Sequence, residues 1–194
     1  MVDVEAMKND ICKDKPGVLL HSCCGPCSTA CIERLTPDYK VTVFYYNPCI
    51  TDHVEYEKRK NEQVRYLSEI DKNTKIEFIE GDYDIQQYFD LIDGLEDEPE
   101  GGERCSVCFA QRLTATAELA VKMKIPFFTT TLTVSPHKNY GIISEIGKNC
   151  EVKGVKFLPI DFKKKAGFQR SIELSKKHNL YRQNYCGCKF SKHR

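Results

Sequence analysis

Residues 18–28 read Val18-Leu19-Leu20-His21-Ser22-Cys23-Cys24-Gly25-Pro26-Cys27-Ser28, an apolar run followed by three cysteines around a Gly-Pro turn signal. This pattern predicts a strand over 18–22, a tight loop, and a helix that starts near Ser28. A loop of this kind lies at the carboxyl end of its strand, where open α/β sheets usually hold their ligands. The stretch therefore predicts both a fold class and the place of a site.

The rest of the chain alternates between strand and helix patterns. Further strands are expected at 41–46, 76–79, 127–132 and 156–160, and helices at 28–35, 52–70, 85–92, 103–124, 139–149 and 168–178. A polar lead-in at 1–16, an acidic stretch at 93–102 expected to be a mobile surface loop, and a cysteine-bearing tail at 181–194 complete the chain. This alternation predicts a single α/β domain over 1–194, a Rossmann-like, mostly parallel sheet with helices on both faces.

The composition narrows the cellular setting. Eleven cysteines in 194 residues, about 6%, are fewer than a small disulfide scaffold would carry. Their number is odd, two are adjacent, and the N-terminus shows no signal-peptide pattern and no bilayer-spanning apolar run. We therefore expect a cytoplasmic, disulfide-free protein without a membrane partner, whose cysteines serve as ligands or catalytic groups. The formal charge of +1 excludes a strongly basic protein but leaves room for local basic patches.

Seven cysteines form three groups. Two pairs, Cys105 with Cys108 and Cys186 with Cys188, join the three cysteines of the first stretch. A single zinc ion or a 4Fe–4S cluster takes four thiolates, so seven exceed the need of either alone. Soft thiolate ligands favour zinc or iron–sulfur centres. The count predicts a metal centre that the fold assembles from distant segments.

Local geometry refines these expectations. Because successive side chains of a strand point to opposite sides, Cys23 and Cys24 are expected to diverge, unless the chain turns at once, and divergent side chains would suit two different metal ions. Cys27, near a helix N-terminus, should favour the thiolate form. Arg112 continues the face of Cys105 and Cys108. It would either balance an anionic centre or hold a phosphate, or else form a surface ion pair with Glu103 or Glu118.

Several residues are expected to be structural. His21 ends an apolar strand and is interpreted as a core histidine with satisfied hydrogen bonds. Four isolated cysteines are expected to have no function: Cys12, Cys31, Cys49 and Cys150. Among them, Cys31 lies one helical turn from Cys27 and is the only reserve ligand that the spacing allows.

Basic and aromatic residues suggest contacts to a nucleic acid. Candidate phosphate contacts are Lys163, Lys164, Lys165, Lys189, Lys192 and Arg194. Candidate stacking residues for an extruded base are Tyr45, Tyr46 and Tyr181. For each residue taken alone, the alternative of a solvated lysine or of a core or strand tyrosine is favoured. His137 and Lys138 either supply a proton or contact a phosphate, or else have a surface role at the start of a helix.

Six motifs together resemble a known family. They are Leu20–Ser28, Tyr46-Asn47-Pro48, Glu103-Arg104-Cys105-Ser106-Val107-Cys108, Thr131–Asn139, Asp161-Phe162-Lys163-Lys164 and Tyr181–Cys188. In this order they resemble the cobalamin-independent, QueH-type epoxyqueuosine reductases over nearly the whole chain. The resemblance implies reduction of epoxyqueuosine to queuosine in a tRNA anticodon, and a fold similar to the PP-loop and nucleotide α-hydrolase group. Because thiols occupy the loop that cradles phosphate in PP-loop enzymes, ATP hydrolysis is not expected.

The resemblance also implies cofactors, a partner and residue roles. It implies a 4Fe–4S cluster, an adjacent mononuclear iron, and an electron donor such as ferredoxin or flavodoxin. Cys105 and Cys108 would hold the cluster with one member each of Cys23/Cys24 and Cys186/Cys188, and the remaining two would hold the single iron with Cys27. Expected catalytic residues are Cys27, His137 and Lys138. Expected substrate-binding residues are Tyr46, Asn47, Arg112, Lys163, Lys164, Tyr181, Arg182 and Gln183.

Two other functions remain open from the sequence alone. A zinc-stabilised nucleic-acid-binding protein would be colourless and would not need seven thiols. A thiol–disulfide oxidoreductase could use Cys24 and Cys27, which have C-x-x-C spacing, but this leaves the two later pairs unexplained.

Overall fold

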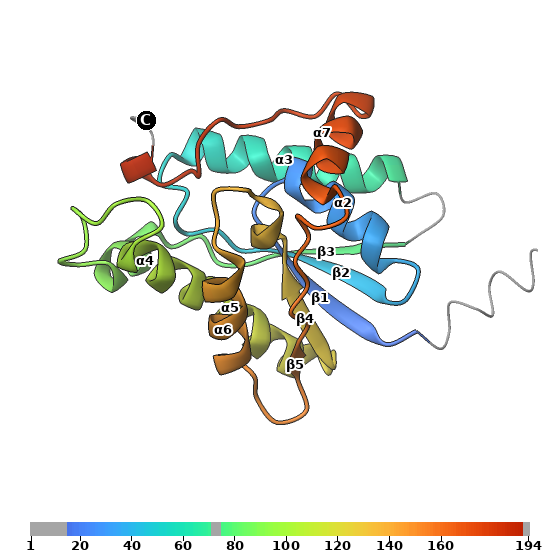
Figure 1. The fold of residues 1–194 in the computed structure, drawn as a ribbon, viewed down its shortest axis with the longest axis horizontal. Helices are drawn as coiled ribbons and strands as arrows, with labels where there is room; N and C mark the ends of the chain where they lie inside the picture. Colours follow the sequence, from blue (N-terminus) through green and yellow to red (C-terminus); the bar gives the residue numbers. More distant parts are fainter. Residues whose placement is uncertain (1–14, 71–74, 192–194) are drawn as a thin grey trace, which may run out of the picture.

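The computed structural model describes residues 15–70 and 75–191 (Figure 1). Most of the expected lead-in, including Cys12, and the tail residues Lys192 and Arg194 lie outside the described residues. The strands are β1 (Gly17–Ser22), β2 (Lys40–Tyr45), β3 (Glu77–Glu80), β4 (Phe127–Thr130) and β5 (Lys156–Phe157). The α-helices are α2 (Gly25–Leu35), α3 (His53–Ile70), α4 (Ile85–Leu91), α5 (Glu103–Met123), α6 (Tyr140–Asn149) and α7 (Gly167–Lys177). Two short 3-10 helices, η2 (Thr131–Val134) and η3 (Lys189–Ser191), complete the order.

The five strands form one parallel sheet in the order β3-β2-β1-β4-β5. β1 lies at the centre, where Val18 pairs with Val41 on one side and with Phe127 on the other. The chain winds outward first through β2 and β3, and then through β4 and β5. The order therefore reverses between β1 and β4, which is the point where open α/β sheets form their binding crevices.

Helices cover both faces of the sheet, as Figure 1 shows. The β1 side chains alternate, so Val18 and Leu20 pack towards α2 and α3, while Leu19 packs towards α5. α7 packs against α2 on the first face, and α6 packs against α5 on the second. The expected α/β class, with parallel strands and helices on both faces, is confirmed. None of the helices in the described part of the chain has the length and apolar character needed to cross a membrane.

Element ends differ from the expectation by more than one residue at three places. α2 begins at Gly25, three residues early, because Cys24 is its N-cap and Pro26, which has no N–H to satisfy, lies in its first turn. β4 stops at Thr130 because the Thr130 hydroxyl accepts a hydrogen bond from the Leu132 amide and starts η2. β5 is only two residues long.

The acidic stretch at 93–102 is a series of turns rather than a free loop. The Arg104 side chain is buried and donates hydrogen bonds to the carbonyl oxygens of Leu95, Glu96 and Glu98. Its guanidinium also lies 4.5 Å from the ring centroid of Phe190. The expected mobility does not fit these contacts, which tie the stretch to the start of α5.

Candidate metal centre

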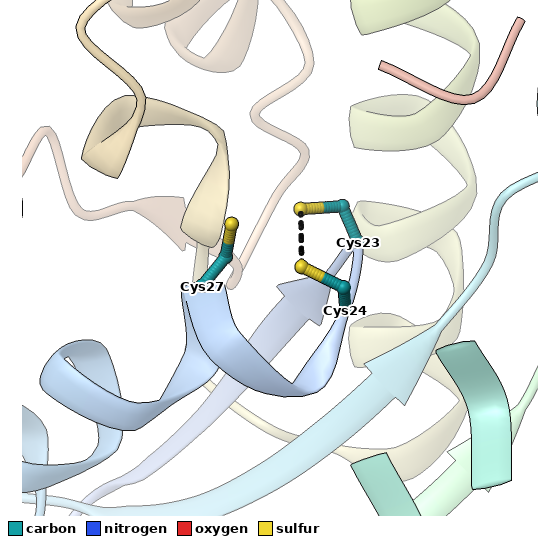
Figure 2. Close-up of side chains that lie close together, drawn as sticks. All are labelled: Cys23, Cys24 and Cys27. Carbon is teal, nitrogen blue, oxygen red and sulfur yellow. Dashed lines mark hydrogen bonds between the residues drawn. The ribbon is translucent and has the colours of Figure 1, made fainter. Parts of the chain in front are cut away.

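The three cysteines of the first group, Cys23, Cys24 and Cys27, lie together where β1 ends. Cys23 follows the strand, Cys24 caps α2, and Cys27 lies in the first turn of that helix. Their sulfur atoms all lie within 4.8 Å of one another, with 3.8 Å between those of Cys23 and Cys24 (Figure 2). Cys23 and Cys24 therefore do not diverge, because the strand ends at Ser22 and the chain turns at once into the helix, the exception that the sequence had left open.

Two neighbours donate hydrogen bonds to this thiol group. The Thr131 hydroxyl, at the start of η2, lies 3.4 Å from the Cys23 sulfur and also accepts from the Cys23 amide at 3.2 Å. The Gln183 amide nitrogen, from the C-terminal tail, lies 2.9 Å from the Cys24 sulfur. Donors to sulfur favour the thiolate, which is the form that binds metal.

The three thiols also set each other's protonation. Hydrogen bonds from Cys24 and Cys27 hold the pKa of Cys23 well below its ordinary value. Burial and the neighbouring Cys23 raise the pKa of Cys24 to about 12. Cys23 is thus the member of the group that most favours the thiolate form, and a thiophilic cation would displace the protons of the other two thiols on binding.

The other two pairs line a neighbouring cavity of about 80 Å³. Cys105 and Cys108 enter it from the first turns of α5, and Cys186 and Cys188 enter it from the tail. The Cys105 sulfur accepts a hydrogen bond from the Gly101 amide at 3.2 Å. The fold therefore brings together two cysteine pairs that lie about eighty residues apart in the chain.

A second, larger cavity of about 530 Å³ adjoins the first. Cys23 and Cys27 line it, together with the tail residues Arg182 and Gln183. Five residues line both cavities: Glu100, Arg112, His137, Lys138 and Cys186. Cys186 is thus the thiol that connects the two groups.

Two cations stand between the thiol groups. Arg112 is only 2% exposed, so the alternative of a surface ion pair is wrong. Its Nε donates to the Cys108 carbonyl oxygen at 3.1 Å, and its Nη2 has no hydrogen-bond partner among the described residues. The nearby Cys186 raises the pKa of Lys138, which keeps this lysine protonated. Both cations therefore suit an anionic centre.

A buried ion pair fastens the tail to the fold. Arg59 of α3 bonds to Glu55 at 2.6 Å and donates to the carbonyl oxygens of Cys186 at 2.9 Å and Tyr185 at 3.4 Å. Gly187, the residue after Cys186, has φ of +117° and lies so close to Ile50 and Arg59 that a Cβ would meet them at 2.9 Å and 3.1 Å. Sequence reasoning did not identify Arg59, because a helical Glu-Arg pair at i,i+4 is common on surfaces.

The expected substrate-binding residues separate into two sets. Arg112, Arg182 and Gln183 line the cavities, as do His137 and Lys138. Five other expected contacts lie outside the cavity linings: Lys163, Lys164, Lys165, Tyr181 and Lys189. The Lys163 Nζ donates to the Lys138 carbonyl oxygen at 3.1 Å, and Lys164 and Lys165 are exposed. The ammonium group of Lys58 lies over the Tyr181 ring, and that of Lys189 lies over the Phe89 ring.

Three expected contact residues are buried in the interior. Tyr45 is fully buried, and Tyr46 is 7% exposed and stacked on Phe44. Asn47 is 1% exposed and donates from Nδ2 to the Ser22 carbonyl oxygen at 2.9 Å. Stacking on a base by Tyr45 or Tyr46, and substrate contact by Asn47, therefore do not fit this structure. Their burial follows from the central position of β2.

His21 is a core residue, as expected. Its ring nitrogens lie 2.8 Å from the Thr130 hydroxyl and 3.1 Å from the Tyr46 carbonyl oxygen. Burial, followed by Arg112, lowers the pKa of His21 to about 3. The ring is thus neutral and connects β1 to both neighbouring segments.

The isolated cysteines differ in their surroundings. The Cys31 thiol is buried and donates to the Cys27 carbonyl oxygen at 3.3 Å, away from the cavities. Cys150 lies 3.4 Å from the Thr114 hydroxyl at the end of α6. Cys49 instead packs against Cys108 and Cys188. All ten cysteines among the described residues are free thiols.

The donor set fits a thiolate-bound metal group. Three sulfurs within 4.8 Å can hold a soft cation, and four more thiols surround the adjoining cavity. The unpartnered Nη2 of buried Arg112 provides a donor for the negative charge of such a group. The fold and the site together define an α/β protein with a group of thiols at its switch point whose arrangement suits a metal ion.

Comparison with known proteins identifies the family. The family described as "Epoxyqueuosine reductase QueH" matches residues 18–194. Proteins with that name are similar to this chain: the Streptococcus pyogenes protein is 42% identical over 91% of this chain and 71% of its own length. The Thermotoga maritima protein is 38% identical over 90% of this chain and 89% of its own length. The chain therefore belongs to the QueH family of epoxyqueuosine reductases, which are oxidoreductases.

Proposed function

We propose that this protein reduces epoxyqueuosine to queuosine in a tRNA anticodon, in the cytoplasm, using a 4Fe–4S cluster and an adjacent iron. In this reaction the two C–O bonds of the epoxide break and a C=C bond forms. Two electrons and two protons are consumed, and the oxygen leaves as water. The observation that carries the proposal is that six of the seven clustered cysteines line the two adjoining cavities, together with the cations Arg112 and Lys138.

The seven clustered cysteines would hold the metal groups. Cys105 and Cys108 would bind the cluster, and Cys27 the single iron, with one member each of the pairs Cys23/Cys24 and Cys186/Cys188 at each group. The position of Cys186 in both cavities supports two groups side by side. When bound, the cluster supplies single electrons and the separate iron supplies Lewis acidity.

Lys138 and Arg112 have the charges that the reaction requires. Lys138 lines both cavities and stays protonated because of Cys186, so its Nζ can donate to an oxygen that gains negative charge. His137 is exposed at the same rim and can carry protons between the cavity and water. Arg112 is held by the Cys108 carbonyl oxygen and compensates the charge of the thiolates.

The larger cavity is the proposed entrance for the modified nucleotide. Arg182 is exposed at its rim and supplies a phosphate contact, with Lys163 and Lys164 nearby on the chain segment before α7. Tyr185 lines the same cavity, so it replaces Tyr45 and Tyr46 as the stacking candidate. A small acidic electron carrier such as ferredoxin or flavodoxin is the proposed donor.

Metal analysis of protein purified without oxygen tests the cofactors. We expect about five irons and four sulfides per chain, with broad visible absorbance. One zinc and a colourless solution would contradict the reductase mechanism and favour a zinc-stabilised nucleic-acid-binding protein. Disulfide exchange without iron would favour the thiol–disulfide oxidoreductase.

Turnover tests the reaction itself. Conversion of epoxyqueuosine in tRNA is followed by mass spectrometry of the nucleosides, with a chemical reductant in place of the donor. Cys27→Ala should abolish conversion, whereas Cys31→Ala, which removes a buried thiol outside both cavities, should retain it. Full activity of the Cys27 variant would contradict the role proposed for the single iron.

A further inference from the structure

Glu100 is the only acidic residue that lines either cavity within the described part of the chain. It lines both of them, so it lies where the smaller, cysteine-lined cavity meets the larger one. The other ionisable residues that line both cavities are Arg112, His137, Lys138 and Cys186. The proposed reaction uses these cations and thiols, and it leaves the carboxylate without a role.

The backbone on both sides of Glu100 is held in place. Before it, the buried Arg104 guanidinium donates hydrogen bonds to three carbonyl oxygens within residues 95–98. After it, the Gly101 amide donates to the Cys105 sulfur at 3.2 Å. Glu100 is therefore fixed relative to the cysteine-bearing start of α5, and its carboxylate belongs to a preorganised wall of the cavities rather than to a free loop.

The Glu100 carboxylate has no hydrogen-bond or ion-pair partner among the described residues. In the same stretch, the Glu98 carboxylate differs because it accepts a hydrogen bond from the Glu103 amide at 3.0 Å. Arg112 and Lys138 line the same two cavities, yet neither forms an ion pair with Glu100. A fixed carboxylate without a partner at a ligand cavity is suited to a cationic group of the ligand.

The proposed substrate carries such a group. In epoxyqueuosine, a secondary amine and a methylene group join the epoxide-bearing five-membered ring to the 7-deazaguanine base. Alkylamines of this kind are cations at neutral pH, as the lysine side chain is. The amine is attached to the ring carbon next to the epoxide, so a residue that holds the ammonium also orients the C–O bonds that break.

We propose that Glu100 is a specificity-determining residue that binds the secondary ammonium group of the substrate through a charge-assisted hydrogen bond. No covalent bond changes in this contact, and the ammonium keeps its proton. The inference rests on the proposed function for the identity of the substrate, but the contact itself needs neither iron nor electrons. Cations alone would attract any nucleotide phosphate, whereas this carboxylate favours a nucleotide that carries an ammonium group.

Binding of two tRNAs that differ only at the wobble nucleotide tests this contact. One carries epoxyqueuosine and the other guanosine, and fluorescence anisotropy measures their affinities for protein purified without oxygen. The reductant is omitted, so nothing is converted. We expect the wild type to prefer the modified tRNA and Glu100→Gln to lose at least about tenfold of this preference. The affinity of the variant for the guanosine tRNA should not fall, because the substitution removes a negative charge.

A third tRNA and further variants make the test specific. A tRNA with 7-aminomethyl-7-deazaguanine keeps an amine but lacks the epoxide ring, and Glu100→Gln should lose the preference for it as well. Glu96→Gln removes the same charge from the same stretch, outside both cavity linings, and should bind as the wild type does. Glu100→Asp keeps the charge and should retain more of the preference than Glu100→Gln. Glu100→Ala is used if circular dichroism shows that the glutamine variant does not fold.

The outcomes separate this inference from the proposed function. An unchanged preference in Glu100→Gln, an equal loss of affinity for all three tRNAs, or a wild type without any preference would overturn the ammonium contact. Loss of the preference in Glu100→Gln, together with wild-type protein that binds no iron and converts nothing, would retain the contact and contradict the reductase. Conversion of epoxyqueuosine by the wild type, with a full preference in Glu100→Gln, would do the reverse.

Discussion

The Gln183 side chain donates from Nε2 to the sulfur of Cys24 over 2.9 Å. The two residues are 159 positions apart, and this contact joins the C-terminal tail to the start of α2. It provides a neutral hydrogen-bond donor to the Cys24 sulfur, which would be a thiolate once a metal is bound. Outer-sphere donors of this kind orient metal ligands and tune their basicity.

Replacement of Gln183 by leucine should weaken metal binding at the first thiol group. The variant keeps the approximate size of the side chain but removes the donor to Cys24, so Co(II) affinity of the metal-free protein should fall about 10–100-fold. Optical titration with Co(II) measures this change. Gln169→Leu, on the exposed side of α7, is the control and should bind as the wild type does. Equal affinities in both variants would show that the contact has no role in ligation.

Removal of the Arg59 guanidinium should destabilise the fold and release the tail. Arg59→Met removes the cation from the partly buried Glu55, whose carboxylate keeps only the Tyr181 hydroxyl as a donor among the described residues, and it removes the donors to the Cys186 and Tyr185 carbonyl oxygens. We expect a loss of about 3 kcal/mol in the free energy of unfolding. Denaturation with urea gives this value for Arg59→Met, Glu55→Gln and the double variant. Because the double variant lacks the uncompensated charge, its loss of unfolding free energy should be smaller than the sum of the losses in the two single variants. Strict additivity would contradict the coupling between Arg59 and Glu55.

A side chain at Gly187 should be harmful for two separable reasons. Gly187→Ala would be strained at φ of +117° and would meet Ile50 at 2.9 Å and Arg59 at 3.1 Å. Gly154, with φ of +88° and open space around it, separates the two effects. We expect the free energy of unfolding to fall by about 3 kcal/mol in Gly187→Ala and by about 1 kcal/mol in Gly154→Ala. Thermal denaturation compares them, and similar losses would mean that crowding at Gly187 is relieved without cost.

Glu62 should contribute to the acid sensitivity of the tail anchor. Hydrogen bonds from Arg65 and from the Tyr181 amide hold the pKa of the Glu62 carboxyl below its ordinary value of 4.5. The unfolded state then binds a proton more readily than the folded state, so this stabilisation is present above pH 4.5 and is lost as the pH falls below it. Glu62→Gln should be less stable at neutral pH and should lose less stability on acidification. Urea denaturation across the pH range tests this, with Glu145→Gln on the exposed side of α6 as control.

Local patterns in the sequence were sufficient for the architecture and for the three cysteine groups that the fold brings together. The apolar run 18–22, the N-cap Asn139 and the alternation of strands and helices each depend on short-range chemistry, so the α/β fold could be predicted. The spacing within each cysteine group, and the family motifs around them, marked the thiols of the centre for the same reason. The ends of the elements were predicted less accurately, because single residues decide them. Cys24 is the N-cap of α2, and the Thr130 side chain ends β4 by capping η2.

Only the tertiary structure decided which residues meet. Nothing in the sequence places Cys49 beside Cys108 and Cys188, or Arg59 beneath the tail, because these contacts join segments separated by many residues. The burial of individual side chains was also decided by the tertiary structure. Tyr46 is buried and does not fit the expected substrate contact, and Arg112 is an enclosed cation rather than a member of a surface ion pair. Local chemistry sets the residue types of a metal centre, and the sequence shows these directly. Which of these residues meet, and which charged groups surround them, depends on how a doubly wound sheet brings distant loops to one edge.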